Sequence, residues 1–239
     1  MSNVELLRFA HDVELARAAA EQWTSQLESL GESSTPYCVA LSGGRIARRF
    51  FEAVVGQARK RRLRLNSVQF FWGDERCVPP TDSESNFAVA RELLLEPLSI
   101  LPEKIHRVRG EDTPESAAAQ AEAELRRIAP IDGSRQPVLD LIFLGLGEDG
   151  HVASLFPGES EKVMTNDQVY RAVIATKPPP RRITLGYSTI AAAEQVWILA
   201  SGPGKENALR DSLAPGGRTP LARVLRLRRQ TRIFTDIAI

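Results

Sequence analysis

The sequence has few of the residues that build metal centres and disulfide frameworks. Two cysteines, Cys38 and Cys77, and three histidines occur among 239 residues. No Cys, His and Asp set has metal-ligand spacing, so no metal site is expected. Two cysteines without a disulfide pattern favour a reducing compartment. A long apolar run is also missing, because "MSNVELLRFAHDVELARAAAEQW" is charged and amphipathic. It is neither a signal peptide nor a membrane span, which predicts a cytoplasmic protein without a membrane partner.

An excess of charge of one sign is absent too. The 31 lysines and arginines nearly balance the 30 aspartates and glutamates, and the formal net charge is +1. This balance gives no reason to expect a nucleic-acid partner. Two local basic runs, at 59–64 and 223–232, are interpreted as solvated faces or helix ends.

Several motifs of enzymes and nucleotide-binding proteins are missing. Neither a P-loop "GxxxxGK[ST]" nor a "GxSxG" nucleophile elbow occurs. "GLGEDG" (145–150) has the glycine spacing of a dinucleotide site, but it lies in mid-chain and Pro157 interrupts the helix that should follow. The sequence therefore predicts no nucleotide hydrolysis and no cofactor.

Apolar runs and helical periodicity alternate along the chain, and we find no internal repeat or clear linker. Strands are expected at 37–42, 67–72, 138–147, 168–176, 194–201 and 231–239. Helices are expected at 9–30, 45–59, 86–95, 113–129 and from about Pro203, with Ser83 as a weak cap candidate for the third. This alternation predicts an α/β fold with a parallel sheet covered on both faces. We expect one domain, residues 1–239, with a small insertion near 160–190.

Polar motifs follow four of the expected strands. They are "SGG", "GDER", "GEDGH" and "SGPGK". Because ligands bind outside the carboxyl ends of parallel strands, these four loops are expected to meet at one pocket. The site proposed from these motifs depends on the convergence of the four loops.

His151 is the strongest catalytic candidate. It follows three glycines and an Asp-Gly pair at an expected strand end, where an imidazole can lie in a cleft as a general base. Asp149 is close enough in sequence to orient the ring. His11 and His106 are not near such a loop, and both are interpreted as structural.

Four further motifs offer anion contacts, each with an ordinary structural alternative. Ser42, Gly43 and Gly44 can form an anion cradle before a helix, or a simple tight turn. In "GDER", Arg76 can bind a phosphate and Asp74 can orient a substrate or a catalytic partner, or both can form a surface ion pair.

The other two motifs lie later in the chain. Lys205 is expected at a helix start, where a bound anion would remove its unfavourable interaction with the helix dipole, although an exposed lysine remains the alternative. In "TKPPPRRITLGYST", Arg182 can cap a phosphate pocket or face water.

Taken together, these motifs resemble the 6-phosphogluconolactonase family. The segments that carry the resemblance are "ALSGG", "FFWGDERCVPPTDSESNFAVARELLL", "DLIFLGLGEDGHVASLFPG", "KPPPRRITLGYSTI", "SGPGKENAL" and "TRIFTDIAI", within residues 37–239. "GHxASLFPG" distinguishes this family from the related glucosamine-6-phosphate deaminases and isomerases.

The resemblance implies a three-layer α/β/α, modified Rossmann-like fold with a mainly parallel sheet. It also implies hydrolysis of 6-phosphoglucono-1,5-lactone in the oxidative pentose phosphate pathway, without cofactor or metal. His151 would be the general base, and Asp74, Arg76, Lys205 and 42–44 would line the sugar-phosphate site. The only expected partner is the small-molecule substrate, bound by a monomer or a weak dimer.

One position departs from the family pattern. After "SGG" the family usually has a small hydroxyl residue, often followed by Thr-Pro, whereas this chain has Arg45-Ile46-Ala47. Either Arg45 itself reaches the phosphate or the loop binds a slightly different group. Two other functions remain open: a sugar-phosphate isomerase or deaminase on the same fold, and a sugar-phosphate-binding sensor.

Overall fold

A six-stranded parallel sheet forms the centre of the molecule. The structure is a computed structural model that describes residues 3–31 and 35–239. In this part of the chain the sheet has the order β1 (Asn3–Arg8), β9 (Gln230–Thr235), β8 (Gln195–Ala200), β5 (Leu141–Gly145), β2 (Tyr37–Leu41) and β3 (Val68–Trp72). All of these pairs are parallel. Nearly every side chain of the central strands β2, β5 and β8 is buried, as a sheet covered on both faces requires. The predicted α/β fold class is confirmed.

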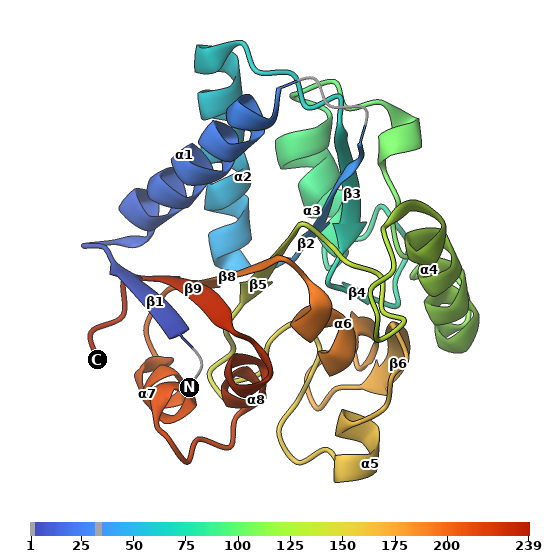
Figure 1. Cartoon of the computed structure of the whole chain (residues 1–239), viewed down its shortest axis with the longest axis vertical. Helices are drawn as coiled ribbons and strands as arrows, with labels where there is room; N and C mark the ends of the chain where they lie inside the picture. Colours follow the sequence, from blue (N-terminus) through green and yellow to red (C-terminus); the bar gives the residue numbers. More distant parts are fainter. Residues whose placement is uncertain (1–2, 32–34) are drawn as a thin grey trace.

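Two long helices pack together on one face of this sheet. They are α1 (Asp12–Leu30) and α2 (Arg45–Arg61), and Figure 1 shows them side by side away from β4, β6 and α4. An aromatic cluster joins them to the strands: the Trp23 and Phe143 ring centroids lie 5.2 Å apart edge to face, and Phe143 and Trp197 lie 5.7 Å apart. Each such pair contributes about 0.5–1.5 kcal/mol beyond the burial of its area.

A second, smaller sheet is antiparallel and has the order β4 (Asp74–Arg76), β7 (Arg181–Leu185), β6 (Tyr170–Ile174). The expected strand at 168–176 therefore exists, but the expectation that it extends the parallel sheet was wrong. The expectation of a plain polar loop after β3 was also wrong, because that loop begins with β4. A strand of three residues is too short to show alternation in the sequence.

The register of this second sheet matters for the site. Asp74 pairs with Thr184 and Arg76 pairs with Arg182, so two residues from distant motifs lie opposite one another. The Tyr170 hydroxyl donates to the Trp72 carbonyl oxygen at 2.7 Å, which joins the second sheet to the end of β3.

The remaining helices lie around these sheets. They are α3 (Asn86–Ala90), which continues as a π-helical turn (Arg91–Leu95), a 3₁₀ turn (Pro102–Lys104), α4 (Pro114–Ile128), α5 (Glu161–Met164), α6 (Tyr187–Ala192), α7 (Glu206–Leu213) and α8 (Pro220–Leu227). The single helix expected from about Pro203 is in fact two helices, α7 and α8. The cap of α3 is Ser85 rather than Ser83, since the Ser85 hydroxyl accepts from the Ala88 amide at 3.1 Å.

The amino-terminal region also differs from expectation. The helix expected at 9–30 begins at Asp12, with His11 as its N-cap, and a strand that was not predicted, β1, precedes it. β1 pairs with β9 along all six of its residues, so the two ends of the described chain form neighbouring strands (Figure 1). No helix within 3–31 and 35–239 is long and apolar enough to cross a bilayer.

The arginines near the carboxyl terminus do not form one solvated face. Arg228 is buried, and its guanidinium donates to the carbonyl oxygens of Ile190, Ala191, Ala193 and Glu194 at 2.8–3.1 Å. These carbonyls lie in the last turn of α6 and in the short segment that leads to β8, where a helix leaves its last carbonyls without intrahelical donors. Burial lowers the pKa of Arg228 to about 10. Of the two interpretations of this basic run, a solvated face does not describe Arg228, whereas a helix end does, because Arg228 caps the end of α6.

Candidate active site

The loops after β2, β3, β5 and β8 meet around one cleft of about 120 Å³. Nine of the ten residues proposed from the sequence line it: Ser42, Gly43, Gly44, Arg45, Asp74, Arg76, His151, Arg182 and Lys205. The tenth, Asp149, lies behind His151 and contacts it. The cleft is also lined by Ile46, Asn86, Gly145, Leu146, Gly147 and Ala153, which sequence reasoning did not single out.

Glycines shape the loop that carries His151. Gly150 has φ +80°, which favours glycine, and the Gly147 amide donates to the His151 carbonyl at 2.9 Å. A Cβ on Gly147 would lie 2.0 Å from His151 Nδ1, so any larger residue would displace the imidazole. Glycine is therefore required at 147 and favoured at 150 to let the ring fold back against its own loop.

Asp149 orients this imidazole. His151 Nδ1 lies 2.5 Å from Asp149 Oδ1, and the His151 amide also donates to this oxygen at 3.2 Å. A carboxylate only accepts hydrogen bonds, so Nδ1 carries the proton and Nε2 is left as the basic nitrogen. Partial burial raises the pKa of Asp149, but the hydrogen bond and charge of His151 outweigh it and hold the pKa below its usual value. The pair is thus a charged carboxylate beside a ring with one free nitrogen.

Phe156 supports the imidazole from the side, a contact that the sequence analysis missed. The centroids of the two rings lie 5.0 Å apart, and the guanidinium carbon of Arg182 lies 5.7 Å from the Phe156 centroid. Phe156 therefore packs against both a proposed base and a proposed cation. No periodicity or motif in "ASLFPG" indicated this role.

Asp74 is held by side chains from two other segments. Ser154 Oγ donates to Asp74 Oδ2 at 2.7 Å, and Asn86 Nδ2 donates to Asp74 Oδ1 at 3.3 Å and to its carbonyl at 2.9 Å. All three residues are buried. No hydrogen bond joins Asp74 to His151 in the described chain, so Asp74 faces the cleft as a fixed acceptor rather than as a partner of the base.

Glu75 fixes the loop that leads from β4 to α3. Its carboxylate accepts hydrogen bonds from the Arg76, Asn86 and Phe87 amides and the Ser85 hydroxyl, all at 2.7–3.0 Å. Burial raises the pKa of Glu75 to about 7, although these donors oppose the rise. Glu75 thereby positions Asn86 and Arg76, a structural role that "GDER" alone did not reveal.

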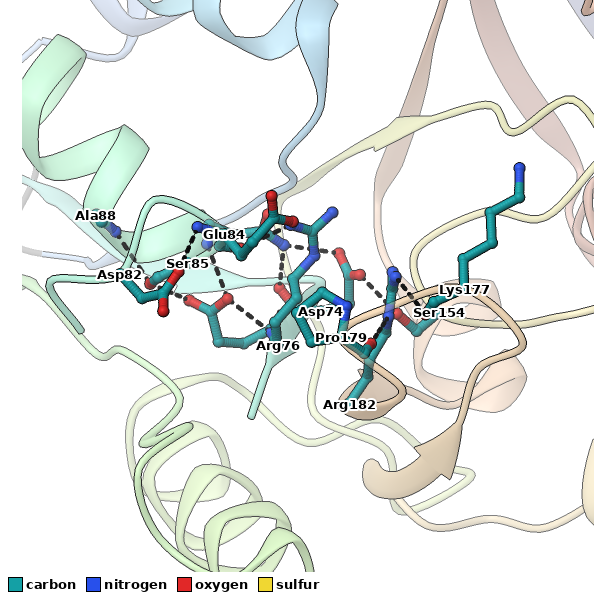
Figure 2. Close-up of polar contacts among 12 residues, drawn as sticks. Asp74, Arg76, Asp82, Glu84, Ser85, Ala88, Ser154, Lys177, Pro179 and Arg182 are labelled. Carbon is teal, nitrogen blue, oxygen red and sulfur yellow. Dashed lines mark hydrogen bonds and ion pairs between the residues drawn. The ribbon is translucent and has the colours of Figure 1, made fainter. Parts of the chain in front are cut away.

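Arg76 and Arg182 form one group of cations at the cleft. Arg76 Nη1 donates to the Glu84 carbonyl at 2.6 Å, and Arg182 Nε donates to the Pro179 carbonyl at 3.0 Å. Figure 2 shows Asp74 between these two arginines, beside Ser154. Burial, followed by repulsion from Arg76, lowers the pKa of Arg182. Two adjacent, partly desolvated arginines are well suited to an anionic ligand.

Lys205 and Arg45 form a second group. Burial lowers the pKa of Lys205, and Arg45 adds to this effect by repulsion. Gly44 is the N-cap of α2 and makes no side-chain capping bond, so the first amides of a 17-residue helix face the cleft uncapped. Free helix N-terminal amides beside two cations make an anion site.

The serine-glycine loop is tightly fitted around its neighbours. The Ser42 hydroxyl donates to the Phe143 carbonyl at 2.8 Å, so this hydroxyl links β2 to β5. A Cβ on Gly43 would lie 1.9 Å from Asn86 Oδ1. The glycine is therefore required by the close approach of Asn86, whatever the loop binds. In the described residues, no group of three or more His, Cys, Asp or Glu side chains could hold a metal ion.

An α/β fold whose strand-end loops bring together a carboxylate-oriented imidazole, two pairs of cations and an uncapped helix is typical of proteins that act on small phosphorylated molecules. Comparison with known proteins defines the class further. The sequence model described as "Glucosamine-6-phosphate isomerases/6-phosphogluconolactonase" matches residues 10–234. The chain belongs to this family.

Individual relatives agree with this assignment. A 6-phosphogluconolactonase of Treponema pallidum (strain Nichols) is 39% identical over 83% of this chain and 81% of its own. One of Streptomyces coelicolor is 34% identical over 91% of this chain and 86% of its own. The solved 6-phosphogluconolactonase of Trypanosoma brucei superposes with a TM-score of 0.82 at 27% identity, covering 98% of this chain and 96% of that one. The predicted resemblance, fold class and enzyme class, a lactone hydrolase, are confirmed.

Proposed function

We propose that this protein hydrolyses 6-phospho-D-glucono-1,5-lactone to 6-phospho-D-gluconate in the oxidative pentose phosphate pathway. The names of its relatives support the substrate. The observation that carries the mechanism is the imidazole of His151, whose Nδ1 is bound to Asp149 while its Nε2 is left free at the cleft.

His151 acts as the general base. Nε2 takes a proton from a water molecule, whose oxygen attacks C1 of the lactone. Asp149 stabilises the imidazolium that results, because its carboxylate is already bonded to Nδ1–H. When the C1–ring oxygen bond breaks, the imidazolium returns its proton to the departing ring oxygen. The products are one carboxylic acid and one hydroxyl, so a covalent enzyme intermediate is unnecessary.

Binding of the remote phosphate positions the reacting carbon. The uncapped start of α2, Lys205 and Arg76 hold the phosphate, and Arg45 and Arg182 add positive charge around it. Arg45 thus takes the place of the hydroxyl that the family usually has. Interactions with a non-reacting group of the substrate lower the barrier by orienting C1 against the base.

Asp74 orients the sugar. Ser154 and Asn86 fix its carboxylate, which can still accept a hydrogen bond from a hydroxyl of the substrate. This role needs no direct contact with His151, in agreement with the geometry.

The test is a spectrophotometric assay with freshly generated lactone, corrected for its spontaneous opening. Turnover that is much faster with the phosphorylated than with the unphosphorylated lactone is expected, and Arg76→Ala should mainly raise KM for the former. Equal turnover of both lactones would contradict the phosphate site. Ammonia release from glucosamine 6-phosphate would instead indicate a deaminase, and tight 6-phosphogluconate binding without turnover would indicate a sensor.

A further inference from the structure

A second pocket, of about 230 Å³, lies on the other side of Phe156 from His151 and is called the arginine pocket here. Its polar lining comes from Glu159, Glu161, Tyr187, Arg218, Thr219, Arg223 and Arg226. It lies between α5 and the start of α8, and Figure 1 shows α8 beside α6, which carries Tyr187. None of these charged residues lines the cleft that holds His151.

Two polar atoms in this pocket are buried without a partner. The Tyr187 hydroxyl and Arg223 Nε have no hydrogen bond within the described chain, although Tyr187 is only 2% exposed. Burial raises the pKa of Tyr187 to about 12; Glu159 adds to the rise, and Arg171, Arg223 and Arg226 oppose it. The hydroxyl therefore lies among these charges. A buried donor without an acceptor costs about 1–3 kcal/mol, so a ligand that accepts hydrogen bonds from both groups would recover this cost.

The charge of the pocket favours an anion. Glu159 is neutralised by Arg171, whose Nη2 lies 2.7 and 2.8 Å from its two carboxylate oxygens. Arg226 donates to the Gly217 carbonyl only, and Arg218 has no hydrogen bond or ion pair with a described residue. After these pairings, Arg218, Arg223 and Arg226 face a single remaining carboxylate, that of Glu161.

That carboxylate can be displaced. Arg223 pairs with Glu161 at 3.0 and 3.2 Å, but the Glu161 side chain is 69% exposed. An ion pair with so exposed a partner contributes about 0–1 kcal/mol. A tetrahedral dianion can bind Arg223 in its place and accept further hydrogen bonds from Arg218, Arg226 and Tyr187.

We propose that the arginine pocket is a second anion site, which binds a phosphate group carried by a small molecule or free in solution. The site is independent of the proposed lactonase chemistry, because it shares no charged residue with the cleft. It nevertheless lies directly behind the base: Phe156 contacts His151, and the Leu221 amide at the start of α8 donates to the Gly150 carbonyl at 3.1 Å. The ligand would therefore lie next to Phe156 and the start of α8, both of which contact the loop that carries His151.

The first test is a phosphate titration followed by NMR at nuclei of the arginine pocket, in the Lys205→Gln protein, in which phosphate binding at the cleft is weakened. The Arg223 Nε–H and the Thr219 amide should shift with a single binding curve. Adding Arg218→Gln and Arg226→Gln should weaken that curve at least about tenfold, because two charged donors are lost. Arg229→Gln is the matched control, since Arg229 is exposed and lies outside the pocket, and it should leave the affinity unchanged.

Tyr187→Phe separates a ligand site from an ordinary packing defect. It removes a hydroxyl that bonds to no described residue, so the protein should unfold at the same or a higher temperature. Phosphate affinity should nevertheless fall about fivefold, as expected for one lost neutral hydrogen bond. Unchanged affinity in this variant, or in the double arginine variant, would overturn the proposal, as would the absence of any shift in Lys205→Gln. A failure of lactonase activity would not affect these readouts.

Discussion

Two histidines of this protein are each bonded to a carboxylate, yet their surroundings differ. His106 Nδ1 lies 2.8 Å from Glu124 and its Nε2 lies 2.8 Å from Gln69, while its ring stacks on Phe71 at 4.7 Å. His151 Nδ1 lies 2.5 Å from Asp149, but its other nitrogen has no partner in the described chain and its ring lines the cleft. The side chain of His106 is 7% exposed and that of His151 is 26% exposed.

The two environments differ although both rings have a carboxylate partner, so that partner alone does not leave a nitrogen free for proton transfer. At His106 both nitrogens lie within hydrogen-bond distance of other side chains, Glu124 and Gln69, so the ring has a structural role and links α4 to β3. At His151 the carboxylate fixes one nitrogen and thereby directs the other to the cleft. The free nitrogen and the cations that line the same cleft distinguish the environment of His151 from that of His106.

The largest expected effect comes from His151→Ala. Loss of the proposed base should lower kcat by about 10²–10⁴-fold, with little change in melting temperature because the ring lies at a cleft. The lactone assay and a thermal melt measure the two quantities. Full kcat in this variant would show that another group transfers the proton.

Asp149→Asn tests the orienting partner. The amide can still accept from Nδ1–H but cannot stabilise the imidazolium by charge, so kcat should fall about 10- to 100-fold, as expected for about 1.5–3 kcal/mol from a charged hydrogen bond. KM should change little. Glu124→Gln, the matched change at His106, should leave kcat at the wild-type value. If both variants lost kcat equally, the distinction between the two histidines would fail.

His106→Ala should produce the opposite pattern. Removing the ring leaves Gln69 and Glu124 without their partner and takes away the stacking on Phe71. The free energy of unfolding should fall by about 1–3 kcal/mol, measured by urea denaturation, while kcat stays within about twofold of wild type. A loss of activity in the fully folded variant would place His106 in the mechanism.

The smallest expected effect is on the pH dependence of stability. Burial lowers the pKa of His106 below its ordinary value of 6.5, although the hydrogen bond to Glu124 opposes this shift. The unfolded chain therefore takes up the proton more readily, so this contribution to stability is present above pH 6.5 and is lost as the pH falls below it. Urea midpoints between pH 7.5 and 5.5 should fall less in His106→Gln than in wild type. Parallel curves would contradict the assignment.

The sequence predicted most of the main sheet because its central strands are long apolar runs and its helices have clear periodicity. The cleft was predicted for the same reason: each polar motif follows a strand, and parallel strands end at one edge. Short elements were missed, namely β1, β4, β7, α5, α6 and the division into α7 and α8, since a segment of a few residues shows no clear periodicity.

Contacts between side chains that are far apart in the sequence could not be predicted from it either. Ser154 with Asp74, Asn86 with Gly43, and Phe156 with His151 depend on how separate loops pack. Arg228 lies in a basic run that is typical of a surface, and its burial depends on the carbonyls at the end of α6. Such roles follow from tertiary structure, because side chains of the same type occur elsewhere on the surface.

The proposed mechanism requires that one imidazole nitrogen, His151 Nε2, is free to face the bound sugar, whereas both nitrogens of His106 are occupied. Proton–nitrogen NMR of ¹⁵N-histidine-labelled protein, titrated with 6-phosphogluconate, tests it most directly. We expect the Nε2 resonance of His151 to shift until the site is saturated, while the resonances of both His106 nitrogens stay unchanged. Binding of the product without a shift at His151, or with an equal shift at His106, would contradict it.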